Sequence, residues 1–128
     1  MPAAILRFNP AAEFFTPESC FINELSNSSD DAELSIARAR VTAGVTTRWH
    51  RLKDTTERYV ILEGRGRVEI GELPPHEVGP GDVVHIPPLC RQRIANIGGH
   101  DLVFLALCTP RFRPESYEDI EDQMQYPI

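Results

Sequence analysis

The chain has 128 residues, of which 41% are hydrophobic and 25% charged. This length suits one domain, and the composition is that of a globular protein rather than a disordered one. The formal charge of −6 and the pI near 5.2 exclude the broad basic surface on which nucleic-acid-binding domains depend.

Short β-prone runs, separated by Gly, Pro and Asp, predict an all-β domain. Residues 63–66 and 79–82 have the chemistry of turns, because glycine tolerates positive φ and proline fixes its own φ. Many short strands at regular spacing indicate a sandwich or a barrel. In chain order, the predicted strands are residues 20–25, 34–42, 47–52, 58–62, 67–70, 82–86, 91–96 and 102–108.

We expect three regions along the chain. Residues 1–30 form an apolar N-terminal arm that packs either on its own barrel or on a second subunit, and residues 31–110 form the barrel. Residues 111–128 form a tail with a short helix between Pro114 and about Met124. The apolar arm and the need to cover sheet edges predict a homodimer.

The three cysteines, Cys20, Cys90 and Cys108, form no CxxC pair. An odd, widely spaced set favours a reducing compartment over a disulfide framework. The longest strongly apolar run, residues 102–108, is too short to span a bilayer, and the first ten residues lack the pattern of a signal peptide. We therefore expect a cytoplasmic protein that binds neither membranes nor nucleic acid.

Residues 44–64, GVTTRWHRLKDTTERYVILEG, place Gly44, His50, Glu57 and Gly64 at a defined spacing. This pattern resembles the first motif of the cupin family, in which a second histidine stands where this chain has Leu52. Four of the five motif positions are therefore present.

Residues 81–96, GDVVHIPPLCRQRIAN, resemble the second cupin motif. Gly81, Pro87 and Asn96 fall in place, whereas Leu89 replaces a glycine and Gln92 replaces a histidine. Both motifs occur in the expected order, so the resemblance implies a cupin-type double-stranded β-helix, also called a jelly-roll barrel, with one pocket inside.

In cupins this pocket often holds a divalent metal. The resemblance implies that His50, Glu57 and Gln92 would hold Mn, Fe, Ni, Cu or Zn, although such a set is poor for Zn²⁺, which prefers His and Cys. Leu52 cannot ligate. The alternative is a metal-free pocket in which His50 hydrogen-bonds Glu57 and Gln92 satisfies the remaining polar groups.

Gln92 and three further residues are candidates for substrate binding. Side chains alternate across a strand, so Arg48 is expected to share the inward face of His50 and to bind a ligand carboxylate or phosphate, or else to pair with Glu57. Tyr59 lies two residues after Glu57 and is expected on the same face of its strand, and His85 lies in an apolar strand. Each of these two either lines the pocket or packs in the core.

Two functions remain open from the sequence. The first is an isomerase, lyase or related enzyme, metal-dependent or not, that acts on a small anionic or sugar-like metabolite with His50 and Glu57 as catalytic residues. The second is a metal-free, non-catalytic module that binds a small molecule. Fold alone does not decide between them.

Overall fold

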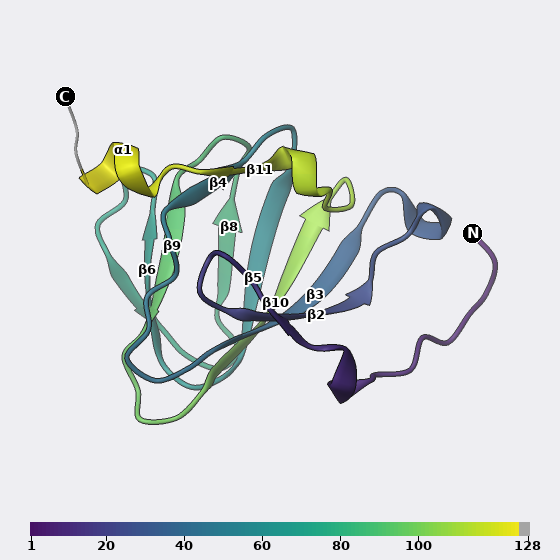
Figure 1. The fold of residues 1–128 in the computed structure, drawn as a ribbon, viewed down its shortest axis with the longest axis horizontal. Helices are drawn as coiled ribbons and strands as arrows, with labels where there is room; N and C mark the ends of the chain where they lie inside the picture. The colour runs from purple at the N-terminus through teal and green to yellow at the C-terminus, as the bar shows by residue number, and fades with distance from the viewer. Residues whose placement is uncertain (126–128) are drawn as a thin grey trace.

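The computed structural model describes residues 1–125, which form two facing antiparallel sheets (Figure 1). The six-stranded sheet has the order β1-β2-β3-β10-β5-β8, and the five-stranded sheet has the order β11-β4-β9-β6-β7. The prediction of an all-β barrel is confirmed. The strands are β1 (Phe14–Phe15), β2 (Phe21–Ser26), β3 (Ser35–Val41), β4 (His50–Leu52), β5 (Thr56–Glu63), β6 (Gly66–Ile70), β7 (His76–Val78), β8 (Val83–Ile86), β9 (Gln92–Asn96), β10 (Leu102–Thr109) and β11 (Tyr117–Asp119).

The hydrophobic core lies between the two sheets. In β8 the burial alternates residue by residue, so that Val84 and Ile86 face inward while their neighbours face solvent. Ile61 of β5 and Ile94 of β9 are each 1% exposed and belong to the same cluster. This period-two pattern is the reason why the sequence forms strands with one buried face.

Three strands were missed from the sequence, namely β1, β7 and β11. Each is two or three residues long and therefore carries almost no periodic signal. The strand predicted at 47–52 is also shorter than expected, since β4 begins only at His50. Before it, the Arg48 amide donates to the Glu18 carbonyl at 3.0 Å, so the chain leaves the regular ladder.

The predicted C-terminal helix is present but is shorter and lies later in the chain. The segment contains a 3₁₀ turn at Pro114–Ser116, strand β11 and then helix α1 (Glu121–Gln125). Strand β11 pairs with β4 in the register Tyr117↔Leu52 and Asp119↔His50, so ladder hydrogen bonds outweigh local helix propensity. Residues 126–128 of the predicted tail lie outside the described residues. Among residues 1–125, no helix combines the length and hydrophobicity of a membrane span.

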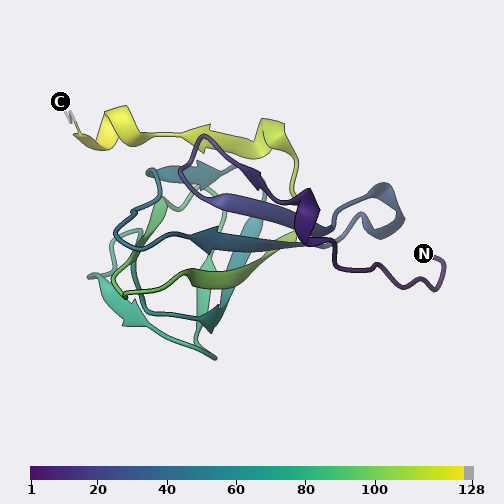
Figure 2. The same cartoon turned by 60° about the horizontal axis from the view of Figure 1, so that its bottom comes forward.

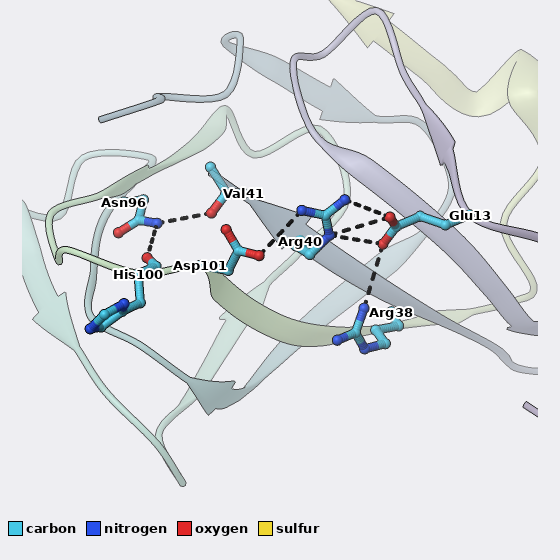
Figure 3. A network of polar contacts seen from close by, with 7 residues as sticks. All are labelled: Glu13, Arg38, Arg40, Val41, Asn96, His100 and Asp101. Atoms are coloured by element: carbon cyan, nitrogen blue, oxygen red, sulfur yellow. Dashed lines mark hydrogen bonds and ion pairs between the residues drawn. The ribbon is translucent and has the colours of Figure 1, made fainter. Parts of the chain in front are cut away.

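The first thirty residues contribute β1 and β2 to the sheet, with β2 paired to β3. Just before β1, Glu13 accepts from Arg40 at 2.6 Å and from Arg38 at 3.5 Å, and Arg40 also reaches Asp101 at 3.2 Å (Figure 3). This network fixes the start of β1 to the outer side of β3. Asn9 still contacts the sheet, since its carbonyl accepts from Asn23 Nδ2 at 2.8 Å. Farther toward the N-terminus the chain, which is exposed at Ile5, extends away from the barrel (Figures 1 and 2).

Four motif positions have positive φ, namely Gly44, Gly64, Gly81 and Leu89, and two of them are informative. Gly64 has φ of +87°, and a Cβ there would lie 2.7 Å from the Asp101 carbonyl oxygen, so only glycine fits. Leu89, which replaces a motif glycine, has φ of +65°. A leucine in this region is strained because its Cβ crowds the following carbonyl.

Candidate functional site

His50 lies at the start of β4 with only 4% of its surface exposed. Its Nδ1 is 2.8 Å from the Arg48 carbonyl oxygen, and its Nε2 is 3.4 Å from Glu18 Oε2. The ring stacks on Tyr117 at a centroid distance of 5.3 Å. Because a carbonyl only accepts, Nδ1 carries a hydrogen. A hydrogen bond between Nε2 and Glu18 Oε2 would therefore need one further proton on either atom.

Glu57, on β5, presents its carboxyl group to the space between the sheets. Its Oε1 is buried without a hydrogen-bond partner among the described residues, and Cys108 Sγ lies 3.8 Å from Oε2. Burial raises the pKa of Glu57 to about 7, against the attraction of His50, and the nearby Glu18 carboxylate adds to the rise. The Gln92 amide lies close enough to lower the pKa of Glu57, although Gln92 Nε2 does not form a hydrogen bond of good geometry with the carboxyl group. Glu57 therefore exchanges its proton near neutral pH.

Gln92 is completely buried on β9, where it pairs with His50 across the ladder. Its Oε1 accepts a hydrogen bond from the Tyr59 hydroxyl. Burial raises the pKa of Tyr59 well above its ordinary value, so this hydroxyl remains a neutral donor. The Gln92 Nε2 has no partner among residues 1–125. Glu57 Oε1 and the Tyr117 hydroxyl are likewise buried without a hydrogen-bond partner among the described residues.

Two adjoining cavities meet at these side chains. The inner cavity, of about 30 Å³, holds roughly one water and is lined by His50, Glu57 and Tyr59. The outer cavity, of about 450 Å³, shares Glu18 and Glu57 with the inner one. This larger volume is typical of small-molecule sites.

The outer cavity has a floor and a roof of different origin. We call floor the inner face of the six-stranded sheet, with residues from β2, β3, β10 and β5. The roof consists of two segments, residues 14–18 and 112–117, which contribute Phe14, Phe112 and Tyr117. In Figure 2 the yellow C-terminal segment crosses one end of the barrel beside the purple N-terminal one.

Two predicted binding residues lie outside these cavities. Arg48 does not share the inward face of His50, because the regular strand begins only after it. Its Nε donates to Asp119 Oδ2 at 2.7 Å, and its side chain is 38% exposed. It therefore pairs with Asp119 and not with Glu57. His85 is exposed on the outer face of β8, since the adjacent Val84 takes the inward position. Both expectations are corrected.

Sequence reasoning missed Glu18 and Tyr117, although both contact His50. They lie far from the two motifs along the chain, one before β2 and the other in the tail. Only the pairing of β11 with β4, and the Arg48–Glu18 backbone hydrogen bond, bring them to the site. The local sequence carried no signal for this.

The donors present do not fit the metal that the resemblance implied. No group of three or more His, Cys, Asp and Glu side chains in the described part of the chain is arranged to hold an ion. Nδ1 of His50 is occupied by a carbonyl and Nε2 faces Glu18, while the Gln92 oxygen is occupied by Tyr59. We therefore derive no chemical step through a metal at His50, Glu57 and Gln92.

The chain is similar to several known proteins. An uncharacterised protein of Methanocaldococcus jannaschii is 36% identical over 110 residues, which cover 84% of this chain and 85% of that protein. The glucose-6-phosphate isomerase of Pyrococcus abyssi is 36% identical over 63 residues, which cover 46% of this chain but only 33% of that enzyme. Among solved structures, the Streptomyces nucleoside dehydratase Pac13 aligns with a TM-score of 0.74 at 13% identity, covering 92% of each chain.

At that identity the solved structure shows the fold alone, and the predicted double-stranded β-helix is confirmed. The family model described as a cupin domain matches residues 37–108, more than half of the chain and the whole of both motifs. The chain belongs to the cupin family.

Proposed function

We propose that this cupin binds a small molecule in its outer cavity and moves a proton within it, as an isomerase or a lyase that needs no metal for this step. The observation that carries the proposal is the Glu57 carboxyl group. It lines both cavities, has one unpartnered oxygen, and has a pKa raised to about 7 by burial. A general acid–base group works best when its pKa lies near the working pH.

The two titratable units of the site take complementary roles. In its ionised form, Glu57 removes a proton from a carbon beside a carbonyl, and the electron pair moves into the adjoining C–C bond. The His50–Glu18 pair delivers its proton to the substrate oxygen. If that oxygen is the carbonyl and the deprotonated carbon bears a hydroxyl, an enediol forms. Glu57 then returns its proton to the former carbonyl carbon, the other hydroxyl gives its proton back to the His50–Glu18 pair, and the isomerisation is complete. If it is a hydroxyl on the next carbon, the C–O bond breaks and water leaves, as in a dehydration.

The relatives favour these two reaction classes. The Pyrococcus abyssi relative is an isomerase, although the match covers only a third of it, and the structural neighbour Pac13 is a dehydratase. Isomerisation and dehydration share the removal of a proton from carbon.

The exchange of carbon-bound hydrogen tests the proposal whatever the product of the reaction is. The protein would be incubated in D₂O with a panel of aldoses, ketoses and nucleosides, and ¹H NMR would follow the loss of C–H signals. We expect at least one compound to exchange and Glu57→Gln to slow this exchange by about 100-fold or more. Glu63→Gln is the matched control, because Glu63 lies exposed on the same strand.

Retention of exchange in Glu57→Gln at the rate of the control would refute the role of this carboxyl group. The second candidate function, a non-catalytic binding module, is favoured by the many apolar side chains in the cavity wall. It predicts that a panel compound binds to the wild-type protein with no exchange of hydrogen and no turnover.

A further inference from the structure

We infer that the outer cavity selects an uncharged or cationic ligand with a flat apolar part, and that it rejects anions. This inference rests on the proposed function only in naming the same cavity as the ligand site. It narrows the substrate class that the sequence suggested, which included anionic metabolites.

The wall of the outer cavity is acidic. Three carboxyl groups, those of Glu18, Glu24 and Glu57, line the outer cavity, and no Lys or Arg among the described residues does so. The guanidinium of Arg48 is turned away to Asp119. Arg111 precedes the wall residue Phe112 but does not itself line the cavity. Its Nη1 donates to Asn27 Oδ1 at 3.0 Å, and its Nε is buried without a partner among the described residues.

An acidic wall disfavours anionic ligands. A phosphate or carboxylate would lie opposite several carboxyl groups, with no Lys or Arg of the described residues lining the wall to pair with it. The carboxyl groups themselves have no Lys or Arg of the described residues beside them in the wall to offset their burial, and burial raises the pKa of Glu24 as well as that of Glu57. A ligand ammonium group, by contrast, would pair with these carboxyl groups, and an uncharged hydroxyl would hydrogen-bond to a carboxyl oxygen.

The roof of the outer cavity is aromatic. Phe14, Phe112 and Tyr117 contribute aromatic rings to it, and Ile22 faces them from the floor side of the cavity. Aromatic side chains favour stacked or edge-to-face contact with a flat ring, and their faces also attract cations. An uncharged ring-bearing polyol, such as a nucleoside, places its ring at the roof and its hydroxyl groups at the carboxyl groups.

A matched set of three probes tests the inference by isothermal titration calorimetry on the full chain. The probes are uridine, uridine 5′-monophosphate and 5′-amino-5′-deoxyuridine, which differ in charge at one position. We expect uridine and the amine to bind at least about tenfold more tightly than the monophosphate near pH 7.5. Glu24→Gln is expected to narrow this gap, whereas the exposed Glu63→Gln is expected to leave it unchanged.

Tighter or equal binding of the monophosphate would overturn the inference, and so would a failure of all three probes to bind. A gap that Glu24→Gln leaves as wide as in the wild-type protein would also contradict the charge argument. The outcome is separable from that for the proposed function. Selective binding without hydrogen exchange would refute the catalytic proposal alone. Hydrogen exchange on an anionic substrate would refute the inferred ligand preference alone.

Discussion

The Glu57→Gln variant is expected to lose most of the pH dependence of stability that the wild-type protein shows between about pH 5 and about pH 8. In the folded protein the pKa of Glu57 is raised from 4.5 to about 7. As the pH rises through this window, the unfolded chain loses this proton before the folded chain does. Rising pH therefore favours unfolding, and the extra stability of the protonated carboxyl group is present only at the acid end.

The magnitude follows from the size of that difference. Each tenfold change in an equilibrium constant corresponds to about 1.4 kcal/mol, so the free energy of unfolding should fall by about 2 to 3 kcal/mol between about pH 5 and about pH 8 because of Glu57 alone. Glutamine keeps the shape of the side chain but does not ionise. The variant should therefore match the wild-type protein at acid pH and exceed its stability at alkaline pH.

Urea denaturation followed by circular dichroism at several pH values measures this difference. His50, Glu18, Cys108 and Tyr59 face the same carboxyl group, so the quantity that tests Glu57 is the difference between the variant and the wild-type protein. The Glu63→Gln control should follow the wild-type curve. Parallel curves for Glu57→Gln and the wild-type protein would show that the carboxyl group is not desolvated as described.

Three further substitutions test features outside the acid–base pair. Leu89→Gly should stabilise the protein by about 0.5 to 1 kcal/mol in thermal denaturation, since relief of left-handed strain exceeds the entropic cost of glycine; destabilisation would argue against that strain. Glu13→Gln should cost about 1 kcal/mol, and less at high salt, because it removes the half-buried pair with Arg40; no loss at low salt would mean that the network contributes nothing. Arg48→Ala should leave ligand affinity in calorimetry within about twofold, since the side chain pairs with Asp119 on the surface; a larger loss would return Arg48 to the site.

The sequence predicted the barrel well because its signals are local. Alternating burial in β8 and the turn chemistry on either side of it are both visible within a few residues. The same holds for His50, Glu57 and Gln92, which a spaced motif identified and which the structure brings to one region of the interior. Tyr59 followed from its parity with Glu57 along β5.

The rest of the site depended on contacts between distant parts of the chain. Arg48 was misplaced because the alternation rule requires a regular strand, and the backbone hydrogen bond from Arg48 to Glu18 shows that the ladder has not yet begun there. Glu18 and Tyr117 were missed because their proximity to His50 arises from tertiary pairing. No property of either residue type at either position could have predicted it.

The separate origin of the two walls of the outer cavity has a consequence for how ligand preference can diverge among related barrels. Glu57, whose carboxyl group we propose as the acid–base group, stands on a central strand whose neighbours are fixed by ladder hydrogen bonds on both sides. The roof of the proposed ligand cavity comes instead from two short segments, 14–18 and 112–117, near opposite ends of the described chain. Exchanging these segments between homologues should therefore transfer specificity while the chemistry, and the strands that support it, stay intact.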